Sequence, residues 1–315
     1  MASQLNFTEI VFDVNAAGTF AADPTRLPGS TRATLFASPR QIVRRRGPDG
    51  LKQIERPIQF AYEMTWEGEF YPGVAWTKIL ANFFQRSAVS GTGMVYTPSD
   101  LAPVEFYMEA QVDGGGELYS LQNCVLASLS VQWQVNSLPV FRMEWKVRSI
   151  GAPEGLTPAT IAEATPAHTI GRPSLTNVYF RRGASAWGSD PPTAYAADAQ
   201  SVNMLFTRDI RHAQFDVDGN ATRWEWSADV DASGRIQAVL SQGDISFLYN
   251  GTDRGLIRVD MPTVLDGAQG FYFDLYAQMA IQNLPIMADA WASRVVEFVS
   301  VQDAAGTSII FYDGQ

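Results

Sequence analysis

Histidine and cysteine are nearly absent from this 315-residue chain, which has two His and one Cys. Nucleophilic catalysis by a Ser-His-Asp or Cys-His arrangement needs a histidine beside the nucleophile. Neither His168 nor His212 accompanies a G-x-S-x-G elbow, and no cluster of Cys, His and carboxylates has zinc-ligand spacing. We therefore predict that the protein is not an enzyme and has no metal and no cofactor. Cys124, in the apolar stretch LQNCVLASL, is interpreted as a buried thiol.

Basic charge and long apolar runs are also scarce. The formal net charge is −10 and the sequence pI is about 4.7, which argues against specific nucleic-acid binding through clustered Lys and Arg. No apolar run approaches the length that spans a bilayer. The N-terminal residues have neither the charged nor the apolar region of a signal peptide. We expect a soluble chain that is made in a reducing compartment, with no membrane span.

Period-two alternation is the dominant pattern that the sequence does contain. In 131–135 and 141–148 apolar residues alternate with Gln, Arg, Glu and Lys, and the connector NSLP supplies turn residues. This pattern predicts a β-hairpin over 126–148 with one wet face. A second hairpin is predicted over 213–230. The predicted apolar sides carry Trp133, Trp145, Trp224 and Trp226.

Both predicted hairpins contain the motif Arg-x-Glu-Trp, at Arg142 and at Arg223. We interpret the two as an internal duplication with an offset of about eighty residues. The alternative is coincidence between two amphipathic hairpins.

One amphipathic helix is predicted over 73–86, with one apolar face. The stretches 13–34 and 151–200, rich in Ala, Pro, Gly, Ser and Thr, are interpreted as loops or arms. The stretch 39–57 is predicted to be a protruding hairpin with a basic tip, because its two flanks meet at Gly-Pro-Asp-Gly. Segment 286–299 begins like a helix and ends like a strand. The apolar face of the helix consists of Trp76, Ile79, Leu80, Phe83 and Phe84.

Residues 229–236 match the opening of an EF-hand calcium loop. Leu240 stands where the closing bidentate Glu should be, and the flanks alternate as strands do. We therefore prefer a hairpin turn to a calcium site. Paired carboxylates of a glycosidase are not apparent at any particular pair of positions.

These features together resemble the tail tube, or major tail, proteins of long-tailed bacteriophages. The resemblance rests on the order of 201–230, 246–262 and 272–301 in the C-terminal half. In the N-terminal half it rests on the helix at 73–86, the strand at 104–112 and the hairpin at 126–148.

The resemblance implies a mostly β fold of two tandem β-sandwich or half-barrel tube domains, with at least one flanking helix and long ordered loops. Domain boundaries would be 1–175, including the long loop 39–56 and the helix 73–86, and 176–315. Three chains would complete a pseudo-sixfold ring, or six chains a hexameric one, and rings would stack around a lumen for DNA. The protein would then be assembled in the bacterial host cytoplasm as part of a virion tail.

A long loop reaches into the adjacent ring in that family, and the resemblance gives this role to 39–56. The inter-ring contact would use Arg44, Arg45, Arg46 and Asp49. Other expected partners are other tail proteins, and passing DNA without specific binding. Competing interpretations are a carbohydrate-binding module, a baseplate or terminator ring protein, and, third, a glycoside hydrolase.

Overall fold

The computed structural model describes residues 4–14, 24–29, 31–37, 42–46, 52–57, 62–71, 74–89, 93–98, 102–113, 116–134, 137–153, 155, 157–164, 176–182, 196–215, 221–239, 254–261, 271–281, 293–301 and 309–313. Within these residues the chain is mostly β, as the alternation predicts. The described part contains one short α-helix, α1 (Val74–Leu80), and one 3-10 turn, η1 (Pro158–Thr160).

Six antiparallel strands close a first barrel in the order β1–β3–β6–β11–β10–β9 and back to β1. Its interior is aromatic, with Trp66, Trp145 and Phe106 essentially inaccessible to solvent. The six strands are β1 (Gln4–Val14), β3 (Thr31–Ala37), β6 (Tyr62–Glu69), β9 (Phe106–Val112), β10 (Leu118–Gln134) and β11 (Val140–Val147).

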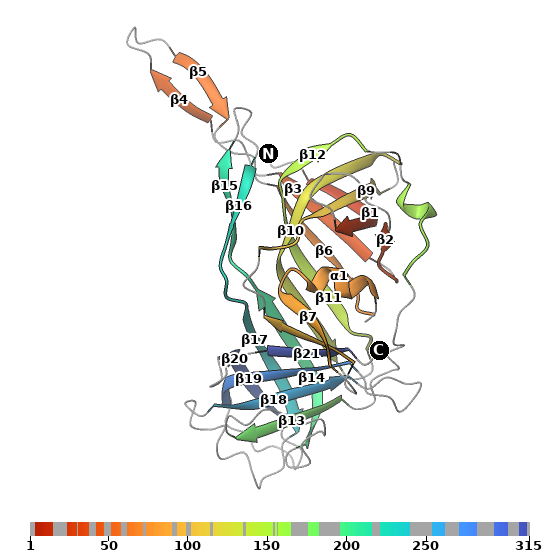
Figure 1. Ribbon diagram of the computed structural model, residues 1–315, viewed down its shortest axis with the longest axis vertical. Coiled ribbons are helices and arrows are strands. Elements are labelled where there is room, and N and C mark those ends of the chain that lie inside the picture. Colours follow the sequence, from red (N-terminus) through yellow and green to blue (C-terminus); the bar gives the residue numbers. More distant parts are fainter. Residues whose placement is uncertain are drawn as a thin grey trace.

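Six further strands close a second barrel in the order β13–β14–β17–β20–β19–β18 and back to β13. All six pairings are antiparallel, as in the first barrel, and Figure 1 shows this barrel at the opposite end of the molecule. Its strands are β13 (Thr176–Arg182), β14 (Ala196–Thr207), β17 (Asp231–Val239), β18 (Arg254–Met261), β19 (Phe271–Ile281) and β20 (Ser293–Ser300).

The two barrels have the same strand order. When the six strands of each are numbered along the chain, both run 1-2-3-6-5-4 around the barrel. In both, a separate hairpin lies between strands two and three. The hairpins are β4 (Ile42–Arg46) with β5 (Lys52–Pro57), and β15 (Ile210–Phe215) with β16 (Ala221–Trp226).

This strand order shows that the correspondence predicted between 126–148 and 213–230 is wrong. The first segment forms β10–β11, whose counterpart in the second barrel is β19–β20. The second segment contains β15–β16, whose counterpart is β4–β5. Arg-x-Glu-Trp occurs in both because both are amphipathic strands, which alternate in the same way wherever they lie.

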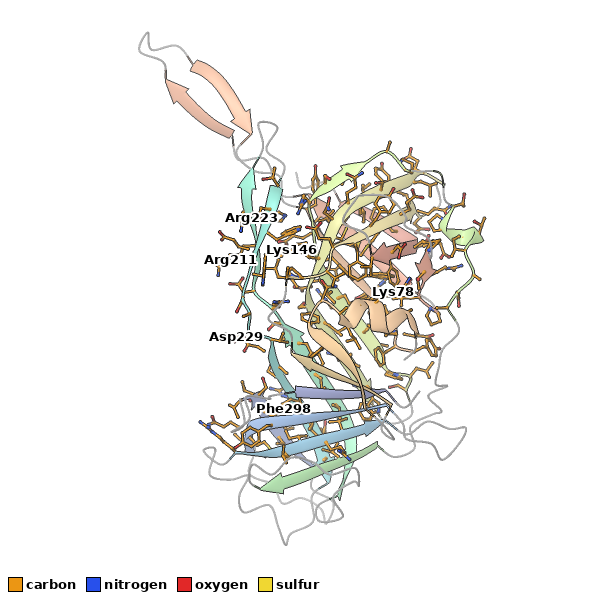
Figure 2. The ribbon with its side chains drawn as sticks, in the orientation of Figure 1. Lys78, Lys146, Arg211, Arg223, Asp229 and Phe298 are labelled. Carbon is orange, nitrogen blue, oxygen red and sulfur yellow. The ribbon has the colours of Figure 1, made fainter. Side chains whose placement is uncertain are left out.

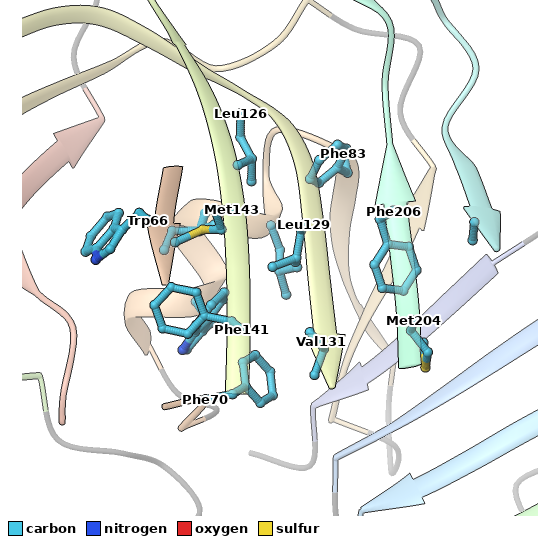
Figure 3. Packing of buried hydrophobic residues seen from close by; sticks show 14 of the residues in the cluster. Trp66, Phe70, Phe83, Leu126, Leu129, Val131, Phe141, Met143, Met204 and Phe206 are labelled. Carbon is cyan, nitrogen blue, oxygen red and sulfur yellow. The ribbon is translucent and has the colours of Figure 1, made fainter. Parts of the chain in front are cut away.

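The barrels are joined through β10, which changes neighbours along its length. Its first half pairs with β9 as far as Cys124, and from Ser128 to Gln134 it pairs with β14 of the second barrel. Asn123, at the bulge before this change, has a φ of 51°, a left-handed conformation that Asn tolerates better than most residues. Figure 3 shows the consequence: Leu129 and Val131 on β10 lie close to Met204 and Phe206 on β14 in one continuous core.

The remaining strands extend these barrels. The hairpin β7–β8 follows α1 but pairs with β21, which itself pairs with β19 of the second barrel. Residues from the N-terminal half therefore contribute to the C-terminal sheet. These strands are β2 (Thr25–Arg26), β7 (Phe84–Val89), β8 (Gly93–Pro98), β12 (Ser149–Gly151) and β21 (Ile309–Asp313).

The predicted helix is shorter than expected. It ends at Leu80, because the next three amide groups donate to carbonyls three residues back, and Phe84 already begins β7. All five residues of the predicted apolar face are nevertheless buried.

Three other predictions need correction or completion. The stretch 151–200 contains β13 and the start of β14, so it is not only loop. Trp226 is 38% exposed, whereas Trp133, Trp145 and Trp224 are buried as predicted. Residues 293–299 of the undecided segment 286–299 lie in strand β20.

Candidate assembly surfaces

One antiparallel sheet runs across both barrels because β10 pairs with β14. Its order is β3–β6–β11–β10–β14–β17–β20–β19. One face of these strands supplies the core, including Trp66, Val131 and Met204. We call the opposite face the polar face. It consists of the side chains that alternate with the core residues, such as Gln132 and Asn203, which are exposed.

Charges on the polar face are arranged in pairs. Arg32 is bonded to Glu67, Lys146 to Glu63 and Arg235 to Glu297, each directly across a strand pair. Arg142 and Glu144 lie 4.0 Å apart on β11. Exposed ion pairs contribute little to stability, so their main consequence here is that neither sign of charge dominates this face.

Exposed hydrophobic side chains interrupt the polar face at a few positions. Val140, Leu205 and Val299 are 44%, 37% and 55% exposed. Leu205 and Val299 line a shallow hollow over β10, β14, β17 and β20. Single exposed apolar residues are normal on a protein surface.

The hairpin β15–β16 lies against the first barrel, as Figure 1 shows. Ile210 and Trp224 from the hairpin form a small buried cluster with Val125 of β10. The guanidinium of Arg148 stands 5.6 Å from the centre of the Trp224 ring, a cation–π geometry. Figure 2 shows Arg211 and Arg223 on this hairpin, with Lys146 on the barrel beside it.

His212 is part of this contact. Its ring centre is 4.6 Å from that of Trp224, and its Nε2 is 3.5 Å from the carbonyl oxygen of Val147. Burial lowers the pKa of His212, against a smaller raising effect of the Val147 carbonyl. The histidine is thus neutral at pH 7 and packs between hairpin and barrel.

Strands β4 and β5 pair antiparallel within the stretch 39–57 that was predicted to be a hairpin, and Figure 1 shows them projecting away from the barrels. Arg44, Arg45 and Arg46 are the last three residues of β4, at the end nearest the tip. Asp49 lies outside the described residues.

The residues that the sequence offered as candidates for catalysis or metal binding do not form a common site among the described residues. Cys124 is buried as predicted, and its burial raises the pKa of the thiol well above its ordinary value. His168 lies outside the described residues. The candidate calcium segment is not the predicted turn, because Asp231 to Arg235 lie in β17 between β14 and β20.

No group of three or more His, Cys, Asp or Glu in the described ranges is arranged to hold a metal ion. No helix among them is long and apolar enough to cross a membrane.

The seam between the barrels was missed by sequence reasoning. Pairing between 128–134 and 201–207 joins strands separated by about seventy residues, and alternation gives no information about which strands become neighbours. The available signal was the unusual length of the alternating stretch around β10, which exceeds one ordinary strand of about five or six residues.

No protein-family model matches this sequence, and no curated protein matches it either.

Proposed function

We propose that this protein is the structural subunit of a bacteriophage tail tube, which forms stacked rings around a lumen. The observation that carries the proposal is the single sheet that crosses both barrels with one polar, ion-paired face. A sheet of this kind, continued from copy to copy, would form the wall of a hollow tube. The resemblance of the sequence to tail tube proteins supports the same assignment.

The two barrels correspond to two tube domains in this proposal, with α1 as the flanking helix of the first. The division at 175 and 176 falls just before β13, the first strand of the second barrel. Two domains per chain favour three chains in a pseudo-sixfold ring over six chains in a hexameric one. Closed cyclic symmetry ends lateral growth, whereas a head-to-tail surface allows rings to stack.

Stacking is assigned to the hairpin β4–β5. Arg44, Arg45 and Arg46, with Asp49 in the tip, would contact the next ring. Because the chain carries a net charge of −10, a basic hairpin finds opposite charge on almost any other copy.

The lumen is assigned to the polar face. The acidic composition alone favours a negatively charged lumen, but the paired charges point to a wall of nearly balanced charge. Such a wall offers no cluster of Lys and Arg that would hold phosphates, so DNA would pass without specific binding. This role belongs in a virion tail, assembled in the host cytoplasm beside other tail proteins.

Electron microscopy of the purified protein tests the proposal. Rings or hollow tubes of a 34.6-kDa chain are expected. A monodisperse monomer that binds glycans would contradict it and favour a carbohydrate-binding module. Single rings that never stack would favour a baseplate or terminator protein, and hydrolysis of a glycan would show an enzyme.

A further inference from the structure

The edge of β14 that receives β10 has a counterpart in the first barrel. Residues 196–199 of β14 pair with β13, the first strand of the second barrel, and residues 201–207 then pair with β10. In the first barrel, β2 pairs with the first strand, β1, and β3 follows β2 in the chain. Both β3 and β14 use their other edge for the third strand, β6 or β17. The edge of β3 that does not face β6 therefore corresponds to the edge of β14 that β10 occupies.

Residues 4–7, which we call the arm, occupy this edge of β3 in the single chain. They pair with residues 33–36, antiparallel to β3 as β10 is antiparallel to β14. The hydroxyl of Thr34 donates to the side-chain oxygen of Asn6, 3.1 Å away. The side chains of Gln4 and Asn6 are exposed, so the arm extends the polar face by one short strand. It lies where the matching edge of β14 has a strand from the other barrel.

The arm is set apart from the rest of β1. The register of β1 shifts between Phe7 and Glu9, and from Glu9 to Val14 the strand pairs with β9. Val11 and Phe12 pair with β2, so β1 keeps a contact with the segment that leads into β3 even if the arm leaves. The second barrel is joined at the matching place, between β13 and β14. The first barrel therefore does not depend on the arm for its closure.

The strand that would replace the arm lies in the second barrel. β10 is the fifth strand of the first barrel, and residues 128–134 continue it beyond its pairing with β9. β19 is the fifth strand of the second barrel. Its described pairing with β18 ends at Gln278, and residues 279–281 continue it. The side chain of Met279 is buried in its own barrel, as that of Leu129 is on β10. Such burial does not conflict with strand addition, which uses main-chain N–H and C=O groups.

A second copy must supply this strand. β3 and β19 are the two end strands of the sheet that crosses both barrels, so they lie far apart within one chain. When β19 of one copy lies beside β3 of another, the sheet continues in the order that β10 and β14 already show.

We propose that the arm blocks assembly in the single chain by occupying the β3 edge, and that the end of β19 from a second copy replaces it in a ring. The inference rests on the proposed function, because it names the strands through which copies continue the sheet. A covered edge also protects the single chain from uncontrolled pairing with other sheets.

A reversible disulfide tests the block. Asn6 and Thr34 face each other across the arm and β3, so Asn6→Cys with Thr34→Cys should form a disulfide that holds the arm in place. The oxidised protein should give several-fold fewer rings in electron micrographs than the same protein after reduction. The matched control is Arg32→Cys with Glu67→Cys, which bridges β3 to β6 at its other edge. This control should assemble equally well in both states.

A second disulfide covers the case in which the first pair of substitutions disturbs folding. Gln4 and Phe36 are also opposite each other in the register of the arm and β3. Gln4→Cys with Phe36→Cys should therefore block ring formation when oxidised and release it when reduced. Rings that form equally well with either disulfide closed would overturn the block.

Photo-crosslinking identifies the replacing strand. Phe36 is 41% exposed and lies opposite Gln4. In Phe36→p-benzoylphenylalanine, irradiation of single chains should give adducts with the arm of the same chain. Irradiation of rings should give adducts in 271–281 of a different copy, recognised by mixing isotope-labelled with unlabelled chains. Leu205→p-benzoylphenylalanine is the matched reference. Leu205 lies opposite Ser130 where β14 meets β10, so its adducts should stay on β10 of its own chain in both states.

The outcomes separate the two proposals. Rings whose Phe36 adducts remain on the arm, or fall outside 271–281 of the neighbour, would overturn this inference alone. Protein that stays monomeric when the arm is not locked, the unmodified chain included, would overturn the proposed function and this inference with it.

Discussion

Arg208 donates from Nη1 to the main-chain carbonyl of Asn82, 3.0 Å away, at the point where β10 leaves β9 for β14. The side-chain oxygen of Asn82 accepts from the amide of Leu126. The main-chain amide of Arg208 donates to the carbonyl of Ala127, and the Nε of Arg208 donates to the carbonyl of Ser227. Where β10 changes partner, some backbone groups lose their partners in the neighbouring strand, and burying such groups without hydrogen bonds is costly. Asn82 and Arg208 bond several of these groups.

Replacing Arg208 should weaken the joint between the barrels. Arg208→Ala leaves the buried carbonyls of Asn82 and Ser227 without this donor, so we expect a loss of about 2–4 kcal/mol in the free energy of unfolding. Urea denaturation measures it. Arg211→Ala is the matched control, because Arg211 is exposed and bonded to Asp209 at the surface, and its loss should stay within about 1 kcal/mol. Equal losses in the two variants would contradict a special role for Arg208 where β10 changes partner from β9 to β14.

Gly234 is expected to be intolerant of a side chain. A Cβ at this position would lie 2.2 Å from the carbonyl oxygen of Asn203 and 2.5 Å from the Phe298 ring. Gly234→Ala should therefore destabilise the second barrel by about 1–3 kcal/mol, because β14 and β20 must move apart. Thermal unfolding measures the change, with Ser233→Ala on the neighbouring position as the control. An unchanged melting temperature for Gly234→Ala would show that β14, β17 and β20 are less tightly packed than described.

Acid should loosen the hairpin β15–β16 from the first barrel. Burial lowers the pKa of His212, while Lys146 and Arg148 disfavour its charge and Glu63 and the Val147 carbonyl favour it. The unfolded chain then binds more protons than the folded one, so stability falls as the pH drops below the ordinary histidine value of about 6.5. Hydrogen exchange of β15 and β16 amides at pH 7.5 and 5.5 should show faster opening in acid. His212→Gln, which does not titrate, should lose this difference; a difference that persists would assign the effect to another group.

The N-terminal residues should restrain assembly. β14 and β3 are the second strands of the two barrels. The segment Ser201–Thr207 of β14 pairs with β10 of the other barrel. The corresponding edge of β3 pairs instead with Gln4–Phe7 of β1, a strand of its own barrel. If copies join by continuing the sheet, this short segment must move aside. Deleting residues 1–6, which spares the buried Phe7, should shorten the lag before tubes appear in light scattering. An unchanged lag, with unfolding stability unaltered, would mean that β3 is not the edge used.

Charge on the hairpin β4–β5 should control stacking. Reversing all three arginines, Arg44→Glu, Arg45→Glu and Arg46→Glu, places like charges against an acidic neighbour, so tubes should shorten while rings persist. Tube length in electron micrographs measures the effect, and Arg211→Glu on the other hairpin is the control. Tubes of unchanged length would refute the inter-ring assignment of Arg44, Arg45 and Arg46.

Local patterns in the sequence predicted local structure well. Alternation around Trp133 and Trp145 placed their side chains correctly, because one face of each strand is buried against the core. The same rule failed at Trp226, which is 38% exposed although Ile210, its partner across the hairpin, is buried together with Trp224.

The arrangement of the strands was beyond the reach of such patterns. Strand order depends on contacts between distant segments, such as 128–134 with 201–207. Alternation within a strand does not indicate which other strand it pairs with. Asn82 and Arg208, which bond backbone groups where β10 changes partner, gave no signal either, since they look like ordinary surface residues in the sequence. The projecting hairpin was predictable because its turn residues and its flanks are adjacent in the chain.

The number and arrangement of chains in an assembled particle test the central proposal most directly. Cryo-electron microscopy of the purified, concentrated protein should show rings of three chains, with six barrels around a lumen lined by the polar face of the sheet that β10 and β14 join. Particles that remain single chains, or rings in which that face points outward, would contradict the account.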